Sequence, residues 1–134
     1  MTITTITPKA RFLARLAARV GAWSLAALIT ALSLVPPSFR PATGTPHDFE
    51  HFAIFCATGL AFSLGYPRNR PRLALTLVIF AGAIEVAQIF VPERHARFGD
   101  FAVDAFAIVI GVAVAALAAR ACSGEFPNPG SRPG

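Results

Sequence analysis

Charged side chains are scarce in this sequence. Only 14% of its 134 residues are Asp, Glu, Lys or Arg, whereas 54% are hydrophobic, and the mean hydropathy is +0.58. Soluble domains carry about 25% charged residues, and a soluble chain of this length buries only part of its surface. The shortage of charge therefore argues against an ordinary soluble domain and predicts that much of the chain lies in a bilayer.

Cysteine is also rare, with two residues, Cys56 and Cys122. We predict no disulfide, because they fall at different depths of the expected membrane domain and bonded cysteines have Cα atoms within about 7 Å. The sequence also lacks a phosphate-binding glycine loop, a nucleophile elbow and the broken-helix pair of many transporters. Its net charge of +5 comes from basic residues between apolar runs. This placement argues against a nucleic-acid partner, which would need a basic stripe with stacking aromatics.

Four apolar runs divide the chain and predict an all-α integral membrane four-helix bundle. A helix of about 17–25 mostly apolar residues crosses a bilayer, so we expect helices over about 20–36, 46–66, 73–91 and 100–119. The predicted organisation is a basic cytoplasmic head at 1–19, the membrane domain at 20–120 and a disordered cytoplasmic tail at 121–134.

The basic residues predict the orientation of these helices. They gather before the first run, between the second and third runs and after the fourth, most densely at Arg68, Arg70 and Arg72. By the positive-inside rule these segments are cytoplasmic, so both termini lie inside a multi-pass protein of the cytoplasmic (inner) membrane. Trp23 and Tyr66 would then lie at the cytoplasmic interface. A cleaved signal peptide is the alternative for the first run, but that run is long and no small-x-small cleavage site follows it.

Polar residues in or beside the predicted helices gather at the opposite, extracytoplasmic face. This outer polar set is our candidate ligand-binding or functional cluster and consists of His51, Glu85, Gln88, Arg94, Asp100 and Asp104. Glu85 is the most informative member, because an ionised residue in an apolar helix costs about 2.5–3.5 kcal/mol and should face protein or water. Glu85 and Gln88 lie three residues apart, and the two aspartates lie four apart, so each pair shares a helix face.

A purely structural role for the same residues is the competing interpretation. Glu85 would pair with Arg94 or Arg97, and Asp100 with His51, to clamp the helices together. The fourth predicted helix continues inward with small residues at every fourth position, namely Ala107, Gly111, Ala115 and Ala119. That stripe permits close packing, either within the bundle or in a helix-mediated oligomer.

One short motif offers a metal-dependent alternative. Residues 47–51 read His-x-x-Glu-His, which is the inverzincin signature. His47 and His51 lie four residues apart, as a zinc pair on a helix requires, and Glu85, Asp100 or Asp104 could add a third ligand. The soluble catalytic domain in which this signature normally works is missing, and such short motifs arise often by chance. We therefore expect neither a metal nor another cofactor.

Two stretches resemble the VanZ-like family of small membrane proteins, HDFEHFAIFCATGLAFSL at 47–64 and EVAQIFVPERHARFGDFAVDAFAIVIG at 85–111. The family pattern is a helix-opening His with an aromatic-rich run, then Glu-x-x-Gln, a Pro-x-Arg turn, two spaced Asp or Asn residues, and glycines at helical spacing. Those elements fall here on His51, Glu85, Gln88, Pro92, Arg94, Asp100, Asp104 and Gly111. The sequence departs from the pattern in lacking the lysine that often precedes the His, and in carrying Ala107 where many members have Gly.

The resemblance implies a role in the cell envelope, because the founding member of the family is associated with resistance to the glycopeptide antibiotic teicoplanin. The first functional hypothesis is therefore a non-enzymatic protein whose outer polar set binds an envelope lipid, a glycan or a glycopeptide. The second is a membrane-embedded enzyme, with or without a metal, that acts on a lipid-linked substrate with Glu85 as general base. The third is a structural or regulatory membrane subunit. The lipid bilayer is the partner that all three share.

Overall fold

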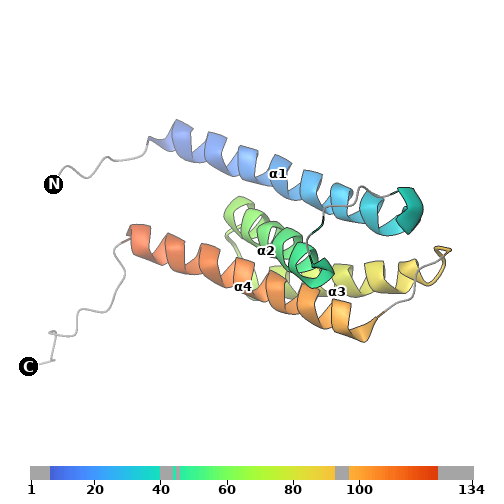
Figure 1. The fold of residues 1–134 in the computed structure, drawn as a ribbon. Coiled ribbons are helices and arrows are strands. Elements are labelled where there is room, and N and C mark those ends of the chain that lie inside the picture. The colour runs from blue at the N-terminus through green and yellow to red at the C-terminus, as the bar shows by residue number, and fades with distance from the viewer. Residues whose placement is uncertain (1–6, 40–43, 45, 93–96, 124–134) are drawn as a thin grey trace, which may run out of the picture.

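All regular secondary structure is helical in the part of the chain that the computed structural model describes, which comprises residues 7–39, 44, 46–92 and 97–123 (Figure 1). This part contains four α-helices and one short 3-10 helix. In chain order they are α1 (Pro8–Leu34), η1 (Pro37–Phe39), α2 (His47–Gly65), α3 (Arg70–Gln88) and α4 (Phe98–Ser123). The predicted all-α class is confirmed.

Helix α1 begins well before the apolar run that predicted it. Its first residue is Pro8, whose fixed φ suits the first turn of a helix. Thr7 is extended, and its hydroxyl accepts a hydrogen bond from the backbone N–H of Ala10 at 3.4 Å. The next residues are mostly Ala, Leu and Arg, which favour helix. Much of the predicted 1–19 head is therefore helical, because helix propensity continues through basic residues that a hydropathy scan leaves out.

The ends of α3 and α4 also differ from the predicted ones by a few residues. Helix α3 starts after Asn69, which adopts the left-handed conformation (φ 54°) and accepts a hydrogen bond from the backbone N–H of Arg72 at 3.4 Å. Asparagine tolerates this conformation better than most residues do. Helix α3 ends at Gln88, three residues short of the predicted 91, and α4 runs on to Ser123. The first residues of the predicted tail are thus helical, and 124–134 lie outside the described residues.

Helix α2 is the central helix, with α1 packed on one side and α4 on the other (Figure 1). Its contact with α4 is the most extensive in the molecule, and α3 packs mainly on α4. Two glycines permit the close approach of α2 and α4. A Cβ atom at Gly111 would overlap the carbonyl oxygen of Cys56, and one at Gly59 would lie 2.5 Å from the carbonyl oxygen of Ile108. The two helix backbones are therefore in direct contact.

The small-residue stripe of α4 lies partly in this contact. Ala107, Gly111 and Ala115 are buried, whereas Ala119 is exposed. The packing seam therefore ends at Ala115, one turn earlier than the sequence predicted, and residues 117–122 of α4 are exposed.

Three of the described helices, α1, α3 and α4, are long and apolar enough to cross a membrane. Helix α2 is not one of them, because its first two turns carry two histidines and two acids, at positions 47, 48, 50 and 51. Large apolar side chains are exposed on the outer faces of the helices, among them Trp23, Ile79, Phe106 and Leu117. An apolar surface of this extent is solvated by lipid rather than water. These features indicate a multi-pass membrane protein that contacts the bilayer.

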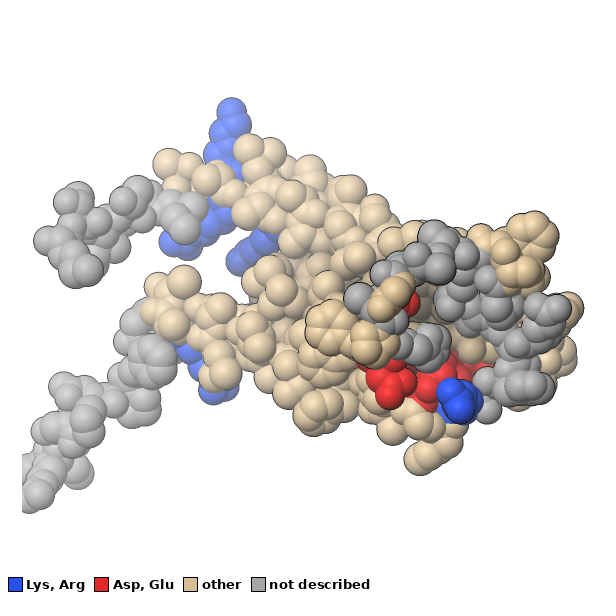
Figure 2. Space-filling view, in the orientation of Figure 1, with Lys and Arg blue, Asp and Glu red and all other residues tan. Residues whose placement is uncertain are grey.

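The charged residues separate by sign along the molecule. In Figure 2, most of the visible Lys and Arg side chains gather at the end that holds the start of α1 and the end of α4. Asp and Glu side chains gather at the opposite end, where a basic side chain also lies beside them. The basic end includes Arg11, Arg15 and Arg19 of α1. The acidic end is formed by the start of α2, the end of α3 and the start of α4, where the outer polar set was predicted.

Candidate functional site

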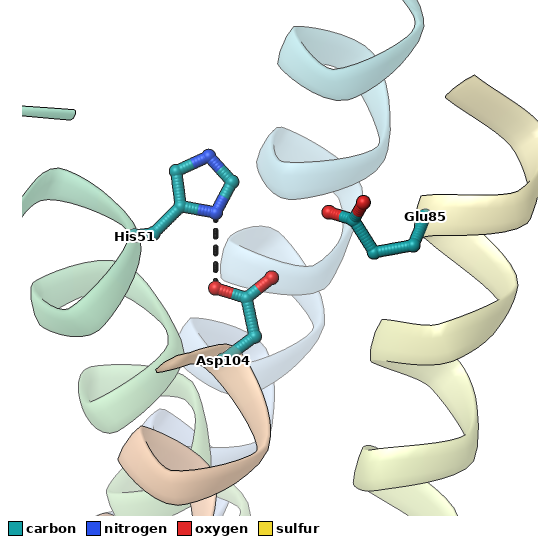
Figure 3. A group of neighbouring side chains, drawn as sticks. All are labelled: His51, Glu85 and Asp104. Atoms are coloured by element: carbon teal, nitrogen blue, oxygen red, sulfur yellow. Dashed lines mark hydrogen bonds and ion pairs between the residues drawn. The ribbon is translucent and has the colours of Figure 1, made fainter. Parts of the chain in front are cut away.

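Three helices each bring one polar side chain to a single buried point. His51 comes from the second turn of α2, Asp104 from the second turn of α4 and Glu85 from the last turn of α3 (Figure 3). One ligand-type atom from each of the three lies within 4.8 Å of the other two. We call these three residues and the neighbouring Gln88 the polar cluster. Residues 19 to 53 positions apart in sequence thus form one site through the packing of α2, α3 and α4.

The imidazole of His51 is held by Asp104. The Nδ1 atom of His51 lies 2.9 Å from Oδ1 of Asp104, a hydrogen bond when Nδ1 carries a proton. Asp104 is only 1% exposed, and the imidazole stacks on the ring of Phe55 at a centroid separation of 6.1 Å. The clamp interpretation had paired His51 with Asp100. The structure places Asp104, one turn deeper on the same face of α4, against the imidazole, and the charge of Asp100 also acts on His51.

Glu85 lies on the buried stripe of α3 and is 5% exposed. Its Oε2 atom accepts a hydrogen bond from the backbone N–H of Arg97 at 3.3 Å. Its Oε1 atom is buried and has no hydrogen-bond partner among the described residues. The clamp interpretation had paired Glu85 with the side chain of Arg94 or Arg97. Arg97 instead supplies a backbone group and is itself exposed, and Arg94 lies outside the described residues.

Gln88 and Asp100 complete the surroundings. Gln88 is 4% exposed and follows Glu85 on the same face of α3, and its Nε2 atom has no hydrogen-bond partner within the described ranges. Asp100 is half-buried, and its charge is close enough to interact with both His51 and Glu85. Four of the six residues of the outer polar set are therefore buried together, with Asp100 beside them.

The metal alternative taken from the sequence changes its membership. Of its residues, His51 and Glu85 lie together, while the side chain of His47 lies outside the described part of the chain. The third residue of the cluster with a metal-binding side chain is Asp104, which the sequence had offered as an alternative third ligand. Sequence spacing favoured two histidines of one helix, whereas the packing of three helices supplies one ligand from each.

Two contributors to the site were not anticipated from the sequence. Phe55 packs under the imidazole, and its position four residues after His51 is a signal that could have identified it. The backbone N–H of Arg97 bonds to Glu85. No residue pattern could have revealed that contact, because every residue except proline has a backbone N–H, whatever its side chain.

The opposite end of the molecule is fixed by a different set of contacts. The Nε–H of Arg19 donates to the carbonyl oxygen of Gly65 at 2.9 Å, and its guanidinium lies 4.8 Å from the ring centroid of Tyr66. The indole N–H of Trp23 donates to the hydroxyl of Tyr66 at 3.1 Å. These contacts join α1 to the end of α2 that lies farthest from the polar cluster.

The polar cluster is rich in hydrogen-bond acceptors. Two buried carboxylates and one imidazole can hold a cation, accept hydrogen bonds from amines and hydroxyls, or remove a proton. No family model, curated protein or solved structure matches the chain. The chemistry of the cluster and the motif resemblance therefore carry the functional argument.

Proposed function

We propose that this chain is a VanZ-like four-helix protein of the cytoplasmic membrane whose polar cluster binds a ligand of the cell envelope. Both termini lie in the cytoplasm, and the cluster opens near the extracytoplasmic face. The ligand is an envelope lipid, a glycan or a glycopeptide antibiotic. The observation that carries the proposal is the convergence of His51, Glu85 and Asp104 from three helices at one buried point.

The separation of charge supports the proposed orientation. Arginines concentrate at the end of the molecule opposite the polar cluster, and basic residues beside membrane helices are retained in the cytoplasm. Trp23 and Tyr66, joined by a hydrogen bond, lie at that same basic end. Aromatic side chains of this kind concentrate at membrane interfaces. Together they favour an inner basic end and an outer polar cluster.

The incomplete pairing of the cluster favours binding over a purely structural clamp. A clamp satisfies its own polar groups, because each buried group left without a partner costs about 1–3 kcal/mol. Within the described residues, Oε1 of Glu85 and Nε2 of Gln88 have no hydrogen-bond partner. A ligand that both donates and accepts hydrogen bonds would satisfy these two groups. Sugars and peptides carry amines, hydroxyls and carbonyls together.

The first test is a resistance phenotype. Expression of the wild-type chain in a susceptible Gram-positive host is expected to raise teicoplanin resistance, and Glu85→Ala is expected to abolish the gain. Val86→Ala is the matched control, because Val86 follows Glu85 in α3 and its side chain is 58% exposed, away from the polar cluster. Equal resistance from wild type and Glu85→Ala, at equal membrane levels, would contradict a role for the cluster.

A second test measures binding directly and covers the other ligand classes. Purified protein in nanodiscs would be titrated with teicoplanin and with a lipid-linked cell-wall precursor. We expect one of them to saturate the wild type and Val86→Ala, and to bind Glu85→Ala at least about tenfold more weakly, since a hydrogen bond to a charged group contributes about 1.5–3 kcal/mol. Failure of both ligands to bind wild type would leave the cluster as a structural clamp.

One observation favours a membrane-embedded enzyme as the second candidate. The carboxylate of Asp104 orients the imidazole of His51 at 2.9 Å, with Glu85 close by, and such pairs serve in general acid–base catalysis. The binding experiment separates the two candidates when its products are analysed by mass spectrometry. Turnover of the lipid-linked precursor that is lost in His51→Gln would establish the enzyme, whereas an unchanged bound precursor would establish the binding protein.

A further inference from the structure

We propose that His51, Glu85 and Asp104 form a binding site for one divalent cation of the Zn²⁺ or Mn²⁺ type. The inference rests on the ligand-binding role proposed above for the polar cluster, and it names a resident component of that cluster. The motif at 47–51 would have placed a metal on two histidines of α2. The geometry points to a site shared by α2, α3 and α4.

The donor set matches this class of cation. It offers one imidazole nitrogen and two carboxylates, each from a different helix. Imidazole suits Zn²⁺ and the other late divalent metals, whereas carboxylates also suit Mn²⁺. Three protein ligands leave at least one coordination position open, as in metal sites that also bind a small molecule. An envelope ligand could occupy that position.

The spacing of the donors requires only a small adjustment. Two ligands of one metal, each about 2.1 Å from the ion, lie about 3.0–3.4 Å from each other. Nδ1 of His51 and Oδ1 of Asp104 are already 2.9 Å apart. The full set lies within 4.8 Å, and the flexible side chain of Glu85 can close the difference. On binding, the ion takes the place of the proton on Nδ1. That proton passes to solvent if the ring is an imidazolium, or moves to Nε2 if the ring is neutral, so the bound imidazole is neutral and protonated on Nε2.

The charge of the cluster calls for a cation. Glu85 and Asp104 are 5% and 1% exposed, and a buried carboxylate is costly unless it is paired or bound to a metal. Glu85 points towards the other two side chains in Figure 3, and its Oε1 atom has no hydrogen-bond partner among the described residues. A divalent ion would neutralise both carboxylates at once and would bond to this oxygen.

The nearby amide supports the same conclusion. Nε2 of Gln88 is buried and lacks a hydrogen-bond partner in the described ranges. A donor in this position is suited to a water or a ligand oxygen on the open side of an ion, and such outer contacts commonly tune metal sites. The ion would then satisfy the free acceptor of Glu85, and a water or ligand oxygen on the ion would satisfy the free donor of Gln88.

The test is metal binding by the full-length protein purified in detergent. Metal-stripped wild type would be titrated with Zn²⁺ by calorimetry and with Mn²⁺ by electron paramagnetic resonance, which reports the loss of the free-ion signal. We expect one ion per chain. We expect affinity to fall at least about tenfold in Glu85→Gln and Asp104→Asn, because an amide is a weaker ligand than a carboxylate.

Two further variants keep the test decisive. Asp48→Asn is the matched control, because it removes an exposed carboxylate from the first turn of α2 and should bind as wild type does. Glu85→His replaces one zinc ligand with another, so it should regain the Zn²⁺ affinity that Glu85→Gln loses. A merely structural glutamate would not be rescued in this way. Equal binding by all variants, or no stoichiometric binding by folded wild type, overturns the proposal.

The outcomes also separate this inference from the proposed function. A folded wild-type protein that binds the glycopeptide or lipid precursor but no stoichiometric Zn²⁺ or Mn²⁺ would support the proposed function and refute the cation site. A protein that binds Zn²⁺ through the cluster but binds neither envelope ligand would support the cation site and refute the proposed function.

Discussion

Asp104 and Asp100 share a helix face but have different environments. Asp104 is 1% exposed and lies against the imidazole of His51, whereas Asp100 is half-buried in the first turn of α4. An acid in the first turn of a helix also interacts favourably with the helix dipole. The two carboxylates should therefore contribute to stability to different degrees.

We predict that Asp104→Ala lowers the free energy of unfolding by about 1–3 kcal/mol, because it removes the partner of a buried imidazole. Asp100→Ala, the comparison one turn away, should cost less than about 1 kcal/mol. Unfolding by SDS in mixed micelles, followed by circular dichroism, measures both. If Asp100→Ala lowered the free energy of unfolding more than Asp104→Ala does, the contact between His51 and Asp104 would not be the main stabilising interaction of the cluster.

The members of the site were predictable, but their pairing was not. Glu85 and Gln88 interrupt an apolar run at helical spacing, and the cost of burying them in lipid predicts that they face protein. Whether His51 meets Asp100 or Asp104 depends on the depth at which α4 packs on α2. That depth is set by the contact of Gly111 with the backbone of Cys56, which no residue in the polar cluster encodes.

At the scale of elements, the contact between α2 and α4 holds the site together. His51 and Asp104 belong to these two helices, and their closest approach lies farther along at Gly59 and Gly111. Glycine at these positions removes the side chain that would keep the backbones apart. The geometry of the polar cluster therefore depends on residues that do not touch it.

Gly111→Leu is expected to destabilise the protein by about 3 kcal/mol, because the new side chain cannot fit against the carbonyl of Cys56. It should also weaken metal or ligand binding by separating α2 from α4. Ala119→Leu, on the same stripe but exposed, should change stability by less than about 0.5 kcal/mol. The SDS unfolding midpoints of the two variants test this difference, and equal midpoints would count against the seam.

Helix types were easier to predict than helix ends. The four apolar runs are long enough to reveal four helices, which the structure contains. The start of α1 at Pro8 was missed because its first turns are stabilised by the cap of Thr7 and by the propensities of Ala and Arg, not by apolar surface. Hydropathy detects the segment of a helix that contacts lipid, and the helix can continue beyond that segment.

For the whole molecule, α1 is longer than a bilayer is thick. Its 27 residues span about 40 Å at 1.5 Å per residue, against a hydrocarbon core of about 30 Å. In the proposed orientation its basic first turns extend into the headgroup region and the cytoplasm, with Arg11 and Arg15 among them.

Cysteine labelling tests this orientation. Cys122 is exposed near the C-terminal end of α4. Ser38 is exposed just after the C-terminal end of α1, at the opposite end of the molecule. In intact cells, a membrane-impermeant maleimide should label Ser38→Cys in a background lacking both native cysteines. It should label Cys122, kept alone in a Cys56→Ser chain, only after the cells are permeabilised. The reverse pattern would invert the topology, and labelling of both sites in intact cells would place the two ends on the same outer side.

The central position of α2 has a consequence for biogenesis. A chain made from its N-terminus completes α2 second, but the helix on which α2 packs most extensively, α4, is completed last. During that interval α2 is held by its contacts with α1, such as the Arg19 hydrogen bond to Gly65, and by a smaller contact with α3. Its charged beginning would otherwise resist entry into lipid. Synthesis stopped before residue 98 would leave His51 without Asp104, and would present the membrane's quality-control proteases with an unfinished three-helix intermediate.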